Sequence, residues 1–139
     1  MPSTSFGDER VQRLLRDRRV AVLTTLLADG APLAMAMWFA ADADGITMLS
    51  QDRLQKVRNL RRDPRVAVVV ESDAGGGSRC VSVRGRAAFV GAGQARPFVE
   101  QLLDRYGAGL ESRWGGRELP RDRVLFRVIP GKVFFWGQA

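Results

Sequence analysis

The 139-residue sequence contains no histidine and a single cysteine, Cys80. Without histidine the chain has no imidazole for acid–base catalysis, for a Ser-His-Asp or Cys-His nucleophilic centre, or for a histidine-containing zinc site. A single cysteine excludes both an intramolecular disulfide scaffold and a cysteine zinc cluster. If the protein is an enzyme, something other than a classical side-chain base must therefore carry its reaction.

Lysine and long apolar runs are also scarce. Lys56 and Lys132 are the only lysines among 22 Lys and Arg residues, so arginine carries nearly all of the positive charge. Apolar runs are too short to cross a bilayer, and residues 1–7 lack the charged start and apolar run of a signal peptide. We therefore expect a soluble, cytoplasmic protein with no membrane partner.

Length and charge narrow the remaining classes of protein. A chain of 139 residues that is 45% hydrophobic can bury one compact core but is short for two ordinary domains, so we expect a single domain over residues 1–139. The 22 basic residues exceed the 15 acidic ones and give a net charge of +7. This charge favours anionic partners, namely phosphorylated cofactors, acidic small molecules, nucleic acids or anionic lipids, without choosing among them.

The first third of the sequence predicts a short helix followed by strands. Residues 8–18 place apolar side chains on one stripe among charges, as in an amphipathic helix. Two apolar runs, residues 20–27 and 33–41, flank an Asp-Gly hairpin signal. Residues 46–50 form the next run after a second turn. We therefore expect three consecutive antiparallel strands.

A short cation-rich helix follows the third strand and ends before Pro64. Ser50 closes the strand, and the first backbone N–H groups of the helix are unpaired and point outward beside Lys56 and Arg58. This corner could hold a phosphate group. The alternative is a solvated helix face, because arginine-rich helices commonly present their charges to water.

The second half of the sequence returns to strands. Residues 65–71 and 80–90 have strand character, separated by a flexible surface loop at 73–78, and Gly85 inside the later strand indicates a bulge or sharp bend. Residues 94–106 have apolar side chains at helical spacing, and Gly107 ends this helix.

The C-terminal part completes the predicted fold. Residues 109–123 are polar and arginine-rich, and we expect them to be irregular. Residues 124–130 and 132–136 predict two strands broken at Pro130-Gly131. Six or seven strands with few helices favour a mainly β protein, a closed or nearly closed antiparallel barrel with peripheral helices.

Short segments that match a known family are spread over almost the whole chain: residues 21–25, 29–32, 37–39, 50–64, 83–87, 105–107 and 130–133. Taken in this order, they resemble the pyridoxamine 5′-phosphate oxidase-like split β-barrels. Within that family the closest resemblance is to the small flavin- or deazaflavin-dependent oxidoreductases.

This resemblance implies a cofactor bound at a homodimer interface. The residues that correspond to the phosphate site are Ser50, Lys56, Arg58 and Asn59. The residues that correspond to the strand along the isoalloxazine-type ring are Met35, Ala36, Met37 and Trp38. The resemblance also implies that the partner subunit contributes Arg79 and Trp136 to the site. Ordinary packing inside a barrel accounts for Met35 and Met37 equally well. Arg79 could simply be an exposed arginine at a strand end, and Trp136 a tryptophan of the core, and these alternatives account for the two residues nearly as well.

The sequence departs from the family pattern in two places. Leu54 and Gln55 stand where many members carry Ser-Arg, so two phosphate contacts of the family are absent. The chain also lacks the additional C-terminal segment, with Arg and His, that true pyridoxamine phosphate oxidases use for their substrate. We therefore do not expect pyridoxamine phosphate to be the substrate.

The leading hypothesis is a homodimeric reductase that uses reduced deazaflavin, coenzyme F-420, to transfer hydride to or from a small organic substrate. Its phosphate and poly-acidic tail would suit a basic groove formed by Lys56, Arg58, Arg61 and Arg53. FMN is the second choice of cofactor. Because either cofactor supplies the hydride itself, the lack of side-chain acids and bases is no obstacle.

Two other interpretations stay open. The basic helix could bind nucleic acid or an acidic protein, but we expect the aromatic residues to be buried at alternating strand positions, which disfavours this module. Alternatively, the barrel could bind a tetrapyrrole or another bulky apolar acid, or have lost its cofactor and act as a sequestering protein; Leu54 and Gln55 keep this interpretation open. The acceptor would lie against residues 73–78 and 109–121, where the sequence has no recognisable substrate motif.

Overall fold

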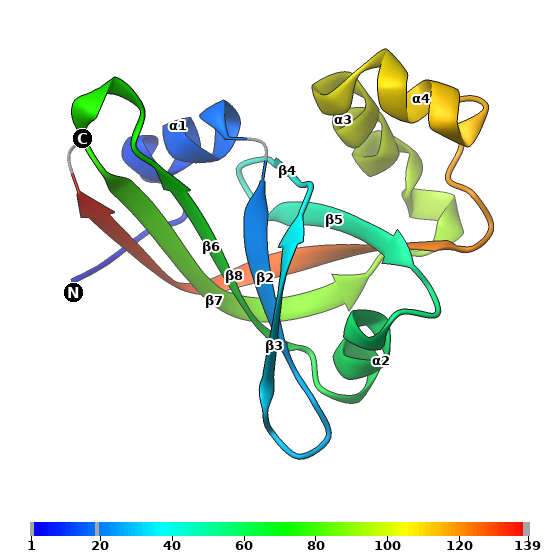
Figure 1. Cartoon of the computed structure of the whole chain (residues 1–139), viewed down its shortest axis with the longest axis horizontal. Helices are drawn as coiled ribbons and strands as arrows, with labels where there is room; N and C mark the ends of the chain where they lie inside the picture. Colours follow the sequence, from blue (N-terminus) through cyan, green and yellow to red (C-terminus); the bar gives the residue numbers. More distant parts are fainter. Residues whose placement is uncertain (1, 19, 138–139) are drawn as a thin grey trace.

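The structure is a computed structural model that describes residues 2–18 and 20–137; the two terminal positions Met1 and Ala139 of the expected domain lie outside the described residues. The strands are β1 (Ser3–Thr4), β2 (Ala21–Leu26), β3 (Pro32–Met37), β4 (Ala40–Ala41), β5 (Ile46–Gln51), β6 (Arg65–Ser72), β7 (Arg79–Phe89) and β8 (Arg123–Gly137). The α-helices are α1 (Glu9–Asp17), α2 (Gln55–Arg62), α3 (Arg96–Tyr106) and α4 (Ala108–Trp114), and the short 3-10 turns are η1 (Ala74–Gly76) and η2 (Ala92–Gln94) (Figure 1).

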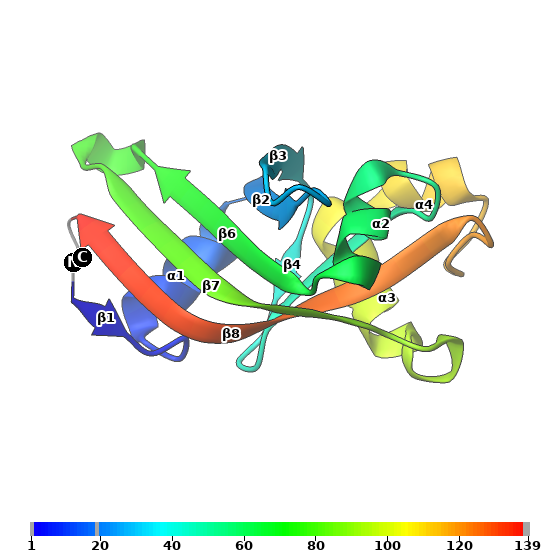
Figure 2. The same ribbon diagram turned by 90° about the horizontal axis from the view of Figure 1, so that it is seen from below.

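The strands form one curled antiparallel sheet in the order β3-β2-β6-β7-β8-β5-β4, with β1 paired to β8. The long strands β7 and β8 bend across the molecule, and the helices lie around the sheet (Figure 2). The two strands at the ends of this order, β3 and β4, are joined by Trp38 and Phe39 alone. Because each residue spans at most about 3.5 Å, the sheet must curl until its two edges nearly meet. The predicted mainly β barrel with peripheral helices is confirmed.

Residues 33–41 do not form the single strand that the sequence predicts. β3 ends at Met37 and pairs antiparallel with β2, whereas β4 begins at Ala40, at the opposite edge of the sheet, and pairs antiparallel with β5. The antiparallel pairings are therefore present, but the expected middle strand is split between the two edges of the sheet. The chain leaves the sheet at Phe39, whose side chain is fully buried in the core. Its backbone groups are bonded to the Tyr106 hydroxyl of α3 instead of to a strand.

Strand β8 is continuous through Pro130, so the expected break into two strands is also wrong. Arg84 of β7 pairs with Lys132, whereas the next residue, Gly85, pairs with Pro130, which leaves Gly131 as the extra residue of a bulge. A proline is tolerated at such a position because the ladder is already interrupted there. The predicted irregularity at Gly85 is confirmed, and a Cβ atom at this position would overlap the Ile129 carbonyl oxygen.

The main core fills the inside of the curled sheet. Helix α1 is capped at its N-terminus by Asp8, whose side chain accepts a hydrogen bond from the Arg10 N–H. The helix buries Val11, Leu14 and Leu15 against the inner faces of β6 and β7. In Figure 2 this helix lies behind those two strands. Helix α2 ends before Pro64, as predicted.

A second, smaller core joins α3 and α4 to the β4–β5 end of the sheet. Residues 108–114 are the helix α4, so the expectation of an irregular segment at 109–123 is wrong for this part. Leu110 and Trp114 are spaced to share one helix face and pack into this cluster beside Leu102 and Tyr106 of α3. In the described part of the chain, the helices lack the length and apolar character needed to cross a membrane.

Candidate anion-binding pocket

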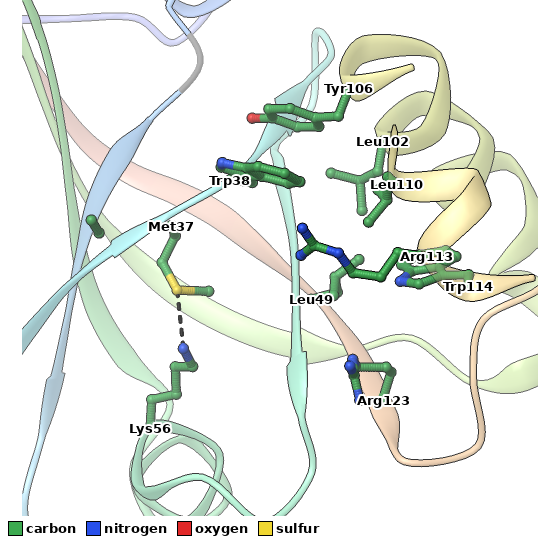
Figure 3. Close-up of a pocket in the computed structure, with 11 residues that line it drawn as sticks. Met37, Trp38, Leu49, Lys56, Leu102, Tyr106, Leu110, Arg113, Trp114 and Arg123 are labelled. Atoms are coloured by element: carbon green, nitrogen blue, oxygen red, sulfur yellow. Dashed lines mark hydrogen bonds between the residues drawn. The ribbon is translucent and has the colours of Figure 1, made fainter. Parts of the chain in front are cut away.

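A pocket of about 290 Å³ lies where the end of β3 meets α2, α3 and α4 (Figure 3). Much of its wall is apolar or aromatic and consists of Ala36, Met37, Trp38, Leu49, Leu102, Tyr106, Leu110 and Trp114. The remaining lining residues are the cations Lys56, Arg113 and Arg123. Because the lining set contains no acidic side chain, the pocket has a strongly positive character.

Lys56 occupies the first turn of α2 and is only 7% exposed. Its Nζ donates a hydrogen bond to the Met37 Sδ at 3.3 Å, and a thioether sulfur is a weak, uncharged acceptor. Among the described residues no carboxylate forms an ion pair with it. Burial accordingly lowers the pKa of Lys56 below its ordinary value. A desolvated ammonium without a counter-charge is unfavourable on its own, so this position is suited to an anionic ligand.

The two arginines reach the pocket from the other side. Arg123, the first residue of β8, has its Nη1 2.7 Å from the Asp122 Oδ2 and is therefore partly neutralised. Arg113 extends from α4 toward the space between Trp38 and Leu49. Within residues 2–18 and 20–137, its guanidinium has no hydrogen-bond or ion-pair partner.

Trp38 forms a flat aromatic wall of the pocket. Its ring stacks on Tyr106 with 4.5 Å between centroids and 7° between planes, yet 46% of its surface stays exposed. An ordered, exposed indole of this kind can hold a planar ring by stacking. Of the four residues predicted to contact such a ring, Ala36, Met37 and Trp38 line the pocket, whereas the exposed Met35 does not.

Of the four residues predicted to hold a phosphate, only Lys56 lines the pocket. Asn59 is buried and ties α2 to the sheet, because its Nδ2 donates to the Thr25 Oγ1 at 3.0 Å while its Oδ1 accepts from Gln55. Arg58 is exposed and donates to the Arg53 carbonyl and to the Gln55 Oε1 at the start of its own helix.

Ser50 is the remaining residue of that set, and its Oγ donates to the Gln51 carbonyl at 3.0 Å. The groove expected from Arg53, Arg58 and Arg61 does not form part of this pocket, and Arg61 lies over the Phe89 ring instead. The assignment of Ser50, Arg58 and Asn59 to a phosphate stays a prediction.

Arg79 and Trp136 lie at the far end of the sheet, at the start of β7 and the end of β8. Trp136 is 54% exposed, which contradicts the alternative that it is a core tryptophan. The expected burial of the aromatic residues is wrong at Trp38 and Phe89. Neither Arg79 nor Trp136 reaches the Lys56 pocket of its own chain. Their predicted contribution to a partner subunit's site stays a prediction.

Several pocket residues were not singled out from the sequence, although three of them lie within residues 109–121, against which the acceptor was expected to lie. Arg113, Trp114 and Leu110 come from the segment that was expected to be irregular, although the four-residue spacing of Leu110 and Trp114 is typical of one face of a short helix. Tyr106 belongs to a motif of the family resemblance, but its sequence position alone does not place it beside Trp38. Arg123 carries no local signal that separates it from the other arginines.

The pocket borders a row of uncharged side chains on the outer face of the sheet. Residues directly opposite each other in paired strands share a face, and one such row crosses five strands as Ala36, Val22, Val69, Ser82 and Phe134. The row contains four apolar side chains and no charge, and Val22 is 41% exposed. Exposed apolar surface of this kind is typical of a contact surface for another protein chain. Ala36 belongs both to this row and to the pocket.

The fold and the pocket together define a small split β-barrel protein with a cationic, aromatic-lined cavity at the edge of its sheet. The family model for pyridoxamine 5′-phosphate oxidase matches residues 8–137, and the chain belongs to this family. A comparison with curated proteins gives no match.

Solved structures are similar over most of the chain. The protein Rv2991 from Mycobacterium tuberculosis is 26% identical, with a TM-score of 0.78, and the match covers 93% of this chain and 83% of that one. A structure described as an F420 reductase is 30% identical, with a TM-score of 0.68 and coverage of 88% and 94%. HutZ, a haem storage protein from Vibrio cholerae, is 19% identical, with a TM-score of 0.76 and coverage of 92% and 93%, and this likeness shows the fold alone.

Proposed function

We propose that the protein is a cytoplasmic oxidoreductase that binds deazaflavin coenzyme F-420, or FMN as the second choice, and exchanges hydride with a small organic substrate. The observation that carries this proposal is that Lys56, a buried ammonium with no carboxylate partner among the described residues, lies beside the exposed ring of Trp38. Both cofactors combine a phosphate with a planar ring, which are the two groups that such a pair can bind. Membership of the family and the likeness to an F420 reductase support the same class of cofactor.

Each pocket residue then has a defined task. Lys56 binds the phosphate through a charge-assisted hydrogen bond, which also supplies the missing counter-charge. Trp38 stacks against the ring, and Tyr106 holds Trp38 in place by stacking on it. The cofactor, when bound, supplies the hydride chemistry, so the chain needs only to bind and orient it. The absence of histidine is compatible with this division of labour.

We further propose that the protein is a homodimer whose subunits meet through the uncharged row from Ala36 to Phe134. The row is apolar, lies on the side of the sheet opposite the core, and reaches the pocket at Ala36. A second copy seated on this face would cover the open side of the pocket. It would also bring its own exposed groups, including Trp136, toward a neighbouring subunit.

Titration of the purified protein with FMN and with F-420, followed by cofactor fluorescence, tests the cofactor proposal. Lys56→Met keeps an unbranched side chain but removes the charge, so the phosphate loses a charge-assisted partner. The expected loss is on the order of 1.5–3 kcal/mol, or about 10- to 100-fold in affinity. Lys132→Met is the matched control, because Lys132 is the other lysine and is exposed on β8 away from the pocket.

The proposal is wrong if neither cofactor binds the parent protein, or if Lys56→Met binds both as tightly as the parent does. Riboflavin, which has the ring of FMN but no phosphate, separates the two contributions. Its affinity should be the same for the parent and for Lys56→Met, because Lys56 is assigned to the phosphate alone.

A further inference from the structure

The pocket has two cationic poles rather than one. Lys56 reaches it from α2, and Arg113 reaches it from α4 on the other side, with Arg123 nearby (Figure 3). The wall between the poles is made of aromatic and aliphatic side chains, among them Trp38 and Leu49. A ligand that fills this space therefore meets positive charge at both ends and apolar surface in between.

Arg113 differs from the nearest comparable arginine of the same region. Arg117 is held by two carboxylates, with its Nη2 2.9 Å from the Asp104 Oδ1 and its Nη1 3.0 Å from the Glu111 Oε2. Arg113, four residues earlier, has no such partner in the described part of the chain, although Glu111 belongs to the same helix. The local acids therefore neutralise the arginine outside the pocket and leave the pocket arginine free.

We propose that the ligand of this pocket is a flat, apolar molecule with two separated anionic groups, one bound by Lys56 and the other by Arg113. The inference rests on the proposed function for the Lys56 pole and adds the second pole to it. It makes Arg113 a specificity-determining residue, because a guanidinium binds a carboxylate or phosphate through paired hydrogen bonds. A cofactor or cofactor–substrate pair with acids at both ends of the ring system satisfies both poles. A tetrapyrrole whose acids share one edge satisfies only one.

The test compares a flat dianion with a monoanion of the same ring. Naphthalene-2,6-disulfonate and naphthalene-2-sulfonate are titrated into the protein, and binding is followed by quenching of tryptophan fluorescence, since Trp38 and Trp114 line the pocket. The parent should bind the disulfonate about tenfold more tightly, the value of one additional charge-assisted contact. Arg113→Gln should lower this ratio to near one.

Two further variants guard against a folding artefact. Arg121→Gln removes an exposed arginine that does not line this pocket, and it should keep the parent's ratio. Arg113→Lys restores the positive charge without the paired hydrogen bonds of a guanidinium, so it should recover only part of the preference for the disulfonate. Near-ultraviolet circular dichroism checks that each variant keeps the parent's tertiary structure.

Equal affinity of the parent for both naphthalene compounds would overturn the inference. So would an Arg113→Gln variant that loses both compounds equally, because Arg113 would then act only through packing. If the parent prefers the disulfonate through Arg113 but binds neither FMN nor F-420, the proposed function fails while the two-pole ligand class stands. If the cofactors bind through Lys56 and the preference for the disulfonate is absent, the proposed function stands and the two-pole ligand class fails.

Discussion

The Tyr106 hydroxyl is bonded to both backbone groups of Phe39, accepting from its N–H at 2.7 Å and donating to its C=O at 2.9 Å. Phe39 lies between β3 and β4 and has no partner strand, so the phenol replaces the missing ladder contacts. The same residue stacks its ring on Trp38. A single side chain of α3 therefore stabilises the point where the chain crosses between sheet edges and positions the aromatic wall of the pocket.

Tyr106→Phe should destabilise the protein without displacing Trp38. The variant keeps the ring but leaves the buried N–H and C=O of Phe39 without their partner, which costs about 1–3 kcal/mol of unfolding free energy. Urea denaturation measures this loss. The near-ultraviolet signal of Trp38 should persist in Tyr106→Phe and be lost in Tyr106→Leu, which removes both the hydroxyl and the stack. An unfolding free energy equal to the parent's would show that water satisfies Phe39 instead.

Lys56 makes the stability of the ligand-free protein depend on pH. Burial lowers the pKa of this lysine in the folded state below the ordinary 10.5. The unfolded chain therefore binds more protons between the two pKa values, and stability rises with pH across this interval. Lys56→Met removes the buried charge and should be more stable than the parent at neutral pH, with an advantage that shrinks as the pH approaches 10.5.

Thermal unfolding of the two proteins across this pH range measures the difference. Lys132→Met controls for the loss of one lysine at an exposed position. A Lys56→Met variant that is less stable than the parent at neutral pH would mean that the ammonium has a favourable partner in the free protein. Saturating FMN should reverse the order of stability, because a ligand stabilises the folded protein by mass action and FMN should bind the parent about 10- to 100-fold more tightly than it binds the variant.

Much of the fold follows from local sequence patterns. The strands expected from residues 20–27 and 65–71, the Asp-Gly turn and the helix end before Pro64 all depend on neighbouring residues, and the structure confirms each of them. The two errors in the sheet arise from distant contacts. The strand break at Phe39 depends on Tyr106, which is 67 residues away, and the continuity of β8 through Pro130 depends on the bulge opposite β7.

The pocket could also be predicted only in part, because some of its residues are brought together by contacts between distant parts of the sequence. Lys56 belongs to a strand-to-helix corner that sequence patterns can locate, whereas Trp38 was indicated by the family resemblance and was expected inside a longer strand. Arg113 becomes a pocket residue only because α4 folds back on α3. The local sequence does not distinguish this arginine from the many others in the chain. Asn59 was indicated by the family resemblance; its side chain is bonded to Thr25, and its assignment to a phosphate stays a prediction.

Gly85→Ala should destabilise the protein through a backbone clash. A Cβ atom at Gly85 would overlap the Ile129 carbonyl oxygen of the neighbouring strand, so the bulge between β7 and β8 must shift. Such overpacking costs about 3 kcal/mol. Gly91→Ala is the control, because a Cβ there meets nothing within 4 Å and its φ of −67° suits alanine. Its unfolding free energy should stay within about 0.5 kcal/mol of the parent's. Similar losses for both variants would contradict the proposed cause.

Val22→Arg should separate the proposed dimer into folded monomers. Val22 lies within the uncharged row, between Ala36 and Val69, so an arginine from each copy would place unpaired charge in the interface. Because Val22 is 41% exposed in the single chain, the monomer itself should lose less than about 0.5 kcal/mol. Sedimentation equilibrium should report the parent at twice 15.3 kDa and the variant at 15.3 kDa.

Ile129→Arg is the matched control for this substitution, because Ile129 is similarly exposed on β8 but lies outside the row. It should remain dimeric. If the partner subunit covers the pocket next to Ala36, the monomeric Val22→Arg protein should also bind FMN more weakly than Ile129→Arg does, although neither substitution alters Lys56 or Trp38. A monomeric parent would refute the dimer directly. A monomeric variant with undiminished affinity for FMN would show that the dimer exists and that each subunit binds the cofactor alone.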